Sequence, residues 1–291
     1  MSTFLQILFS SLETGSVYAL ASLGIIIIFQ TSRMQNFAQG SVGMLNAFVA
    51  TFFLINTGAS PYLAAFVGML SAFVTGVLVD FFIMRNAKHV GAIGKEIITF
   101  GLIMFFLGIA PMIFGTSPLS FPRFIQEGTY QIMGASVTYN AVLNIVVGLS
   151  LMTVLFLFLQ KTKWGLAVRV TASSEKTAQL MGVPTKLITM GAWAVAASLG
   201  ALSALMLAPA ITVNVSMMDS VQISALVACV LGGFQTFYGP VIGAYIIGLS
   251  KNLLSFYVSS TWGEALMYLL ILIFIIFRPN GLIGKKKIKK V

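Results

Sequence analysis

Long apolar stretches separated by short polar segments make up most of this chain. A helix that crosses the hydrocarbon core of a bilayer needs about 20 consecutive apolar residues. Six stretches are of about this length, at residues 5–31, 37–56, 61–84, 96–115, 139–160 and 187–208. In hydrocarbon every backbone amide must be bonded internally, and the chain lacks the alternating segments of a membrane barrel. The pattern therefore predicts an all-α, polytopic membrane protein.

A seventh apolar stretch, at 220–254, differs from the other six because it is interrupted. The interrupting residues are Gly232, Gly233, Gly239 and Pro240. We expect a broken or re-entrant pair of helices there, and a last span at about 263–277. Lipid cannot satisfy the backbone groups that a break frees, so the break must be buried in protein or face water. Transporters place such breaks at binding or gating points, and a hairpin turn between two ordinary spans would give the same pattern.

The distribution of Lys and Arg predicts the orientation, because cytoplasmic loops are enriched in both. We place Arg33, the loops 85–95 and 161–186, and the chain from Arg278 onward in the cytoplasm. Of the 17 Lys and Arg residues, the two then left outside are Arg123 and Lys251. The N-terminus is expected outside and the C-terminus in the cytoplasm, which requires an odd number of crossings. Seven crossings plus a re-entrant pair, or nine crossings, satisfy this requirement.

Composition favours a membrane protein over a soluble one. Hydrophobic residues make up 58% of the chain and charged residues 8%, against about 25% charged residues in soluble domains. The net charge of +10 could indicate nucleic acid, but half of it comes from lysines in a basic tail at 285–291. Such a tail beside a span is typical of a cytoplasmic anchor on anionic lipid. We expect one transmembrane domain, 1–284, followed by this tail, and no nucleic-acid partner.

The sequence carries no motif for energy conversion or catalysis. A Gly-x-x-x-x-Gly-Lys-Ser/Thr phosphate loop does not occur, so the chain cannot hydrolyse ATP by itself. The acidic residues fall in loops or near predicted helix ends, whereas ion-driven carriers usually place an ionisable group at depth. The one histidine, His89, has no clustered Cys, His or carboxylate beside it, which disfavours a metal or catalytic role. We expect no catalytic residue, no metal and no cofactor of its own.

The cytoplasmic loop 161–186 contains the signals of a short helix. A serine cap, an acidic first turn and a glycine stop predict a helix from Glu175 to Met181, capped by Ser173 or Ser174. A helix of about two turns is unstable in water by itself. The residues expected on its exposed surface are Ala178, Leu180 and Met181. The helix either lies on lipid headgroups or docks a cytoplasmic motor.

Two uncharged amides, Asn36 and Gln39, follow Arg33 at the start of the second apolar stretch. They could line a polar path, because polar side chains in spans tend to face the bundle interior or a cavity. They could equally cap a helix or bond a neighbouring backbone group. The residues themselves leave both interpretations open.

The sixth span carries small residues at four-residue spacing. They are Ala192, Ala196, Gly200, Ala204 and Ala208. Such stripes let helix backbones approach closely. We expect an internal packing seam along this helix, with a subunit interface as the alternative.

Several groups of residues, in order along nearly the whole chain, resemble one family. They are Gly15, Tyr18-Ala19-Leu20 and Leu23-Gly24; Asn36-Phe37-Ala38-Gln39-Gly40; Arg169, Ala172, Ala178 and Met181-Gly182-Val183; Leu231-Gly232-Gly233, Gly239-Pro240 and Gly243; and Arg278-Pro279-Asn280-Gly281-Leu282-Ile283-Gly284. The chain is similar to the branched-chain amino acid permease family of ABC importers, and most to its LivH-type subunit. Gln39 stands where the family more often has His, and Ser41 and Lys251 stand where many relatives have acidic residues. These departures concern the substrate more than the fold.

The resemblance implies a permease subunit of a binding-protein-dependent ABC importer in the bacterial cytoplasmic (inner) membrane. Its substrate would be a branched-chain or other apolar amino acid, moved by alternating access. Its partners would be two cytoplasmic ATPase subunits that bind the ATP, a second homologous permease subunit or a second copy, and an external solute-binding protein. The alternative is a passive channel or facilitator for a small polar solute such as urea or an amide.

The expected site residues form two groups. Those expected to dock the ATPase are Arg169, Glu175, Lys176, Ala178, Met181 and Gly182. Those expected along the translocation path are Asn36, Gln39, Gly232, Gly233, Gln235 and Gly239.

Overall fold

The computed structural model describes residues 2–87, 89–125, 128–132, 134–279 and 281–283. Its helices are α1 (Ser2–Ser32), α2 (Gln39–Thr57), α3 (Pro61–Leu78), the π-helical η1 (Val79–Met84), α4 (Ala92–Phe114), α5 (Tyr139–Lys161), α6 (Lys163–Ser173), α7 (Glu175–Leu180), α8 (Thr185–Ile211), α9 (Asp219–Gly232), α10 (Tyr238–Tyr257) and α11 (Gly263–Phe277). The two strands are β1 (Thr129–Ile132) and β2 (Ala135–Thr138). The basic tail expected at 285–291 lies outside the described residues.

Within the described part of the chain, six segments are long and apolar enough to cross a membrane. They are α1, α2, α3 continued by η1, α4, α5 and α8. Each coincides with one of the six predicted stretches. The predicted break is also present, because α9 has 14 residues and α10 has 20, with a non-helical connection between them. These helices, with α11, confirm the predicted polytopic helical fold, and their number is consistent with the predicted seven to nine spans.

Helix α8 lies at the centre of the bundle, where it packs against α1, α2 and α3. The small residues predicted to form a seam along it are all buried. A Cβ added to Gly43 of α2 would lie 2.6 Å from the carbonyl oxygen of Gly200, so the two backbones are in direct contact. The seam is internal to the chain, which confirms the predicted packing role.

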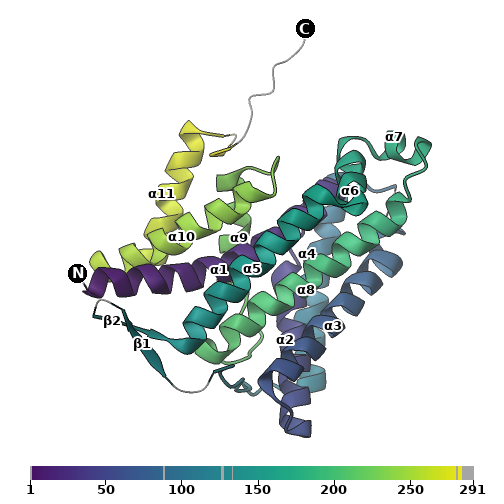
Figure 1. Cartoon of the computed structure of the whole chain (residues 1–291). Coiled ribbons are helices and arrows are strands. Elements are labelled where there is room, and N and C mark those ends of the chain that lie inside the picture. The colour runs from purple at the N-terminus through teal and green to yellow at the C-terminus, as the bar shows by residue number, and fades with distance from the viewer. Residues whose placement is uncertain (1, 88, 126–127, 133, 280, 284–291) are drawn as a thin grey trace.

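Around this centre the helices form two groups (Figure 1). Helices α2, α3 and α4 lie on one side of α8, and α9, α10 and α11 lie together on the far side of α1. In the outer helices α3, α4 and α5 only 22–28% of the apolar window is buried, whereas 78% is buried in α1 and 67% in α8. Apolar side chains on an outer face are what contact with lipid requires.

The two ends of the bundle carry different structures. Helices α6 and α7 lie at one end and the β1–β2 hairpin at the opposite end (Figure 1), and we call these the α7 end and the hairpin end. The hairpin pairs Thr129 with Thr138 in antiparallel register. It was not predicted, because two strands of four residues are too short to produce a clear alternating pattern. Ala135 and Val137 are its buried positions.

The seam predicts a large stability difference between two glycine substitutions. Gly43→Ala would place a methyl group against the Gly200 carbonyl, and we expect it to lower the free energy of unfolding by about 1–3 kcal/mol. Gly108→Ala in α4 is the control, because an added Cβ there meets no atom within 4 Å and alanine favours helix. Thermal unfolding of the two variants in detergent measures the difference. Equal unfolding midpoints for the two variants would contradict close backbone contact along the seam.

Candidate functional site

The α7 end carries a short, capped helix. The hydroxyl of Ser174 accepts a hydrogen bond from the backbone N–H of Thr177 at 3.2 Å, so Ser174 is the cap. Helix α7 then ends at Leu180, one residue earlier than predicted. Gly182 follows in the left-handed conformation with φ of +80°, which glycine adopts without strain.

The exposed tip of α7 is apolar. Leu180 is 89% exposed and Met181 is 70% exposed, whereas Ala178 is fully buried. The expectation that Ala178 lies on the exposed surface is therefore wrong. Helix α7 packs against α6 and α8, and that packing turns the face of Ala178 inward. The apolar surface offered to a partner consists of Leu180 and Met181.

The other residues expected to dock an ATPase lie on the surface of the same end. They are Arg169 on α6 and Glu175, Lys176 and Gly182 on or beside α7, and all four are exposed. Gln179 connects α7 to its surroundings. Its Nε2 donates to Glu175 Oε1 at 3.2 Å and to Thr185 Oγ1, at the start of α8, at 3.1 Å. Contact of the four exposed residues with an ATPase remains a prediction.

Helix α6 was not predicted, although the sequence contains signals for it. Thr162 caps it by accepting from the backbone N–H of Gly165 at 3.2 Å, and its buried residues recur at helical spacing. Arg33, just after α1, donates from Nε to the carbonyl oxygen of Ala172 at 2.8 Å. This bond attaches α6, and α7 with it, to the connection between α1 and α2.

That connection, residues 33–38, is not helical and leads into the start of α2. The buried amide side chains at this point, Asn36 and Gln39 first among them, form a cluster that we call the amide junction. Asn36 and Gln39 are each 1% exposed. Asn36 Nδ2 donates to Gln39 Oε1 at 3.2 Å, and Gln39 Nε2 donates to the carbonyl oxygen of Ala196 at 2.6 Å. Their amides thus bond each other and a neighbouring backbone, as the second interpretation of these residues requires. Their part in a translocation path remains a prediction.

Helix α9 supplies a third amide to the junction, Gln222. Its Oε1 accepts from the backbone N–H of Gly40 at 2.6 Å, and its Nε2 donates to the carbonyl oxygen of Asn36 at 3.4 Å. Backbone that leaves helical geometry inside a membrane bundle needs such partners. Sequence reasoning missed Gln222, and the signal that could have found it is an amide inside an apolar stretch.

Helix α2 begins inside the bundle, and α9 begins beside it, with its first residue Asp219 exposed. Gln39, the first residue of α2, contacts Ala196 near the middle of α8. Gln222, in the first turns of α9, contacts the start of α2. Neither helix start has a side-chain cap from its N-cap residue. Two helix N-termini, each with the partial positive charge of a first helical turn, therefore lie side by side.

A cavity of about 330 Å³ lies beside these two helix starts. Its polar lining residues are Ser41, Asp219 and Gln222. The other side chains around it are apolar, from Phe37, Met44, Ile103, Leu107, Val215, Met218 and Ile223. Among these lining residues, Asp219 is the one ionisable group. The cavity therefore suits a ligand with a large apolar part and a cationic group.

The glycine break lies at the opposite end of α9 from this cavity, and it is buried in protein. Gly232 ends α9, and Gly233 follows with φ of +92°. A Cβ added to Gly239 would lie 2.5 Å from the carbonyl oxygen of Gly232, so the two arms touch. Gln235 lies on the exposed side of the connection. The expected path residues therefore fall in two separate places.

The closing segment of the chain packs onto this break. The backbone N–H of Leu282 donates to the carbonyl oxygen of Leu231 at 2.7 Å. From α1, Gln30 Nε2 donates to the carbonyl oxygen of Phe234, also at 2.7 Å. Backbone groups freed by the break are thus satisfied by protein, which is one of the two predicted solutions.

An ion pair at the other face of α9 was also missed. Lys251 lies within α10, with Nζ 3.2 Å from Glu264 Oε2 and 3.0 Å from the hydroxyl of Tyr18. The hydroxyl of Tyr268 donates to Glu264 and lies 2.9 Å from Ser224 Oγ. The cluster links α1, α9, α10 and α11. Among the described residues, no group of His, Cys, Asp and Glu could hold a metal ion.

Comparison with known families decides the identity of this bundle. A family model described as "Branched-chain amino acid transport system / permease component" matches residues 7–276. The chain belongs to this family. Its motifs at the first helix, the amide junction and the glycine break therefore identified the family correctly, and the chain is the permease subunit of an ABC importer.

Individual relatives cover nearly the whole permease. The high-affinity branched-chain amino acid transport system permease protein LivH of Escherichia coli K12 is 27% identical over 99% of this chain and 98% of its own length. The probable LivH of Methanocaldococcus jannaschii is 25% identical over 98% and 95%. The fructose import permease protein FruG of Bifidobacterium longum is 26% identical over 82% and 73%.

One solved structure has the same overall fold. It is PsaBC from Streptococcus pneumoniae in complex with Fab, which covers 94% of this permease and 89% of its own chain with a TM-score of 0.51. The identity is 14%, so this similarity concerns the arrangement of helices alone.

The bonds made by Gln222 predict that its removal destabilises the folded protein. Gln222→Leu would leave the N–H of Gly40 and the carbonyl of Asn36 without their partner, and we expect the free energy of unfolding to fall by about 1–3 kcal/mol. Gln160→Leu, at an exposed position near the end of α5, is the control. Thermal unfolding in detergent measures both. A Gln222→Leu midpoint no lower than that of the control would contradict the proposed role of the amide.

Proposed function

We propose that this permease imports branched-chain or other apolar amino acids with the help of a solute-binding protein. The observation that carries the proposal is the cavity beside the starts of α2 and α9. It combines a carboxylate, two helix N-termini and a wall that is mostly apolar. An apolar amino acid has three matching parts: an ammonium group, a carboxylate and an aliphatic side chain.

Each part of such a substrate has a partner in the cavity. Asp219 would accept hydrogen bonds from the ammonium group, and the partial positive charge at the N-terminus of α2, beside Ser41, would attract the carboxylate. Met44 and Leu107 would contact the aliphatic side chain. A neutral solute such as urea has no positive charge to balance Asp219 and no aliphatic part for the apolar wall, which disfavours the channel alternative. The names of LivH and BraD relatives support the same substrate class.

We infer that two ATPase subunits bind at the α7 end, one on this chain and one on a second permease subunit or copy. The ATPases would bind the ATP, and the exposed pair Leu180 and Met181 would enter an apolar recess on their surface. Charged residues beside this pair, Glu175 and Lys176, would set the orientation of docking. An external solute-binding protein would meet the hairpin end.

This arrangement requires the α7 end to face the cytoplasm of a bacterial inner membrane, with the N-terminus outside. The two basic loops support it, because both lie at the α7 end. Arg85 and Lys95 from one loop and Lys186 from the other line a common cavity. Their clustering at one end of the bundle is what the positive-inside rule expects of a cytoplasmic face.

Alternating access would be driven through the connection between α1 and α2. Arg33 bonds α6 beside the docking helix, and Gln39 bonds α8 beside the cavity. A movement of α6 and α7 imposed by the ATPases would reach the start of α2 through residues 33–38. The cavity would then change its opening from one side of the membrane to the other.

The docking hypothesis predicts the effect of placing charge on the apolar tip. Leu180→Asp with Met181→Asp should abolish co-purification of the ATPase and uptake of labelled leucine, because two carboxylates cannot enter an apolar recess. Val90→Asp is the control, since Val90 is an exposed apolar residue in the other loop at the α7 end. The hypothesis fails if the double variant still captures the ATPase and takes up leucine at the rate of the control.

The cavity predicts the effect of removing its one charge. Asp219→Asn should lower leucine uptake by about tenfold or more, the value of one charge-assisted hydrogen bond, while the ATPase still co-purifies. Ser220→Ala, at the next position of α9, is the control and should keep normal uptake. Unchanged leucine uptake by Asp219→Asn would exclude Asp219 as the ammonium partner.

A further inference from the structure

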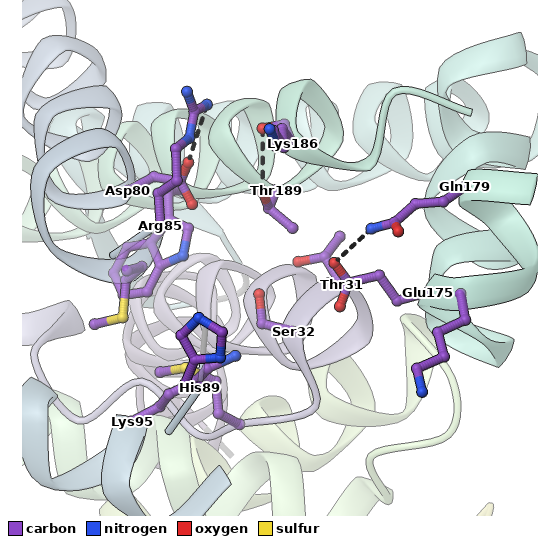
Figure 2. A pocket seen from close by; sticks show the side chains of 14 residues that line it. Thr31, Ser32, Asp80, Arg85, His89, Lys95, Glu175, Gln179, Lys186 and Thr189 are labelled. Atoms are coloured by element: carbon purple, nitrogen blue, oxygen red, sulfur yellow. Dashed lines mark hydrogen bonds and ion pairs between the residues drawn. The ribbon is translucent and has the colours of Figure 1, made fainter. Parts of the chain in front are cut away.

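A second cavity, of about 490 Å³, opens at the α7 end between α1, η1, α4, α7 and α8. Five basic residues line it, Arg85, His89, Lys95, Lys176 and Lys186. Figure 2 shows Arg85, His89 and Lys95 on one side, Glu175 and Gln179 on the other, and Thr31 and Ser32 between them. Segments far apart in the sequence thus bring their cations to one space.

The two carboxylates of this pocket have partners within it. Arg85 Nη2 lies 4.0 Å from Asp80 Oδ2, and this aspartate is buried. Glu175 Oε1 accepts a hydrogen bond from Gln179 Nε2 at 3.2 Å. The charge of Asp80 is therefore balanced by Arg85, and Glu175 lies on the α7 side of the pocket.

The lysines of the pocket are not balanced in this way. Within the described part of the chain, no carboxylate lies within 4.0 Å of Lys95, Lys176 or Lys186. Three lysines and Arg85 face two carboxylates, which leaves a net charge of +2 with the histidine neutral. A pocket with this excess attracts an anion that carries more than one acceptor oxygen.

The elements beside the pocket also present lipid-facing apolar side chains. Phe82 in η1 is 62% exposed, and Ile93 and Ile97 in α4 are 76% and 64% exposed. Lys95 lies between these two isoleucines in the sequence. A basic pocket that borders such a surface at the end of a membrane bundle has the parts that a phospholipid needs: cations for the headgroup and apolar surface for the chains.

We propose that this pocket binds a phosphate-bearing anion, a chemistry shared by the headgroup of an anionic phospholipid and by inorganic phosphate. The apolar surface of η1 and α4 favours the phospholipid. The pocket joins the docking helix α7 to α1, η1 and α4, so a bound phosphate would hold α7 against the bundle. The site is independent of the transported substrate, and its test measures binding rather than uptake.

The test compares the unfolding temperature of the full chain in neutral detergent with added phosphatidylglycerol, phosphatidylcholine or millimolar inorganic phosphate. Phosphatidylglycerol should raise the midpoint of the unmodified chain by about 5 °C, as a ligand well above its dissociation constant does. Lys95→Gln with Lys186→Gln should lose most of this shift. Lys161→Gln with Lys163→Gln removes the same charge from residues outside the pocket and should keep it.

The outcomes separate the two sources of phosphate. A shift with phosphatidylglycerol alone identifies the lipid headgroup, and an equal shift with inorganic phosphate identifies a small anion. Equal shifts in both double variants, or equal shifts with phosphatidylcholine and phosphatidylglycerol, would overturn the proposal. If the pocket variant unfolds early, the amount of phosphatidylglycerol that co-purifies per chain, measured by mass spectrometry, gives the same comparison. Equal amounts in the two double variants would again overturn it.

Discussion

Close backbone contact along α8 is the constraint on which the rest of this bundle depends. Small residues at every fourth position let α1, α2 and α3 approach the α8 backbone, and Gly43 and Gly200 mark the closest approach of α2. Hydrogen bonds between helices follow from this proximity, such as that from Ser203 Oγ to the carbonyl oxygen of Val17 at 2.9 Å. A larger side chain at any of these positions would separate the helices and remove such bonds.

The same contact explains why α2 can begin inside the bundle. Gln39 reaches the carbonyl of Ala196 because the two backbones are close there. The non-helical segment before α2 frees backbone groups that lipid could not satisfy. Asn36 accepts from the N–H of Ala38, and Gln222 bonds the carbonyl of Asn36 and the N–H of Gly40. These amides hold the junction together. The open space beside them is the mainly apolar cavity that Asp219 also lines. Gln222 belongs to both, because it bonds the start of α2 and also lines the cavity.

The features that the sequence predicted well depend on local pattern. Span positions follow from the length of apolar stretches, and α7 follows from its serine cap and its glycine stop. Features set by packing between distant segments were missed or misread. Ala178 is buried because α6 and α8 cover it, and Lys251 is paired because Glu264 is brought to it by α11. Neither contact produces a periodic pattern of residues in the sequence.

The two parts of the candidate site, α7 and the amide junction, also come together only through contacts between distant segments. For this reason the sequence did not show that they are connected. Helix α7 and the amides Asn36 and Gln39 are more than 130 residues apart along the chain. In space, the connection at 33–38 bonds both. Arg33 donates to Ala172 of α6, the backbone N–H of Gln35 donates to Glu96 of α4 at 3.1 Å, and Gln39 donates to Ala196 of α8.

A displacement of α6 therefore acts on a non-helical segment whose other bonds lead to α4 and α8. A non-helical connection can change its backbone angles without breaking a helix, unlike the long helices on either side of it. Helices that meet along a close-packed seam move as rigid bodies, because their backbones leave no space for gradual adjustment. In the proposed mechanism, a movement imposed at the α7 end would be absorbed at residues 33–38, next to the start of α2, where the wall of the apolar cavity begins.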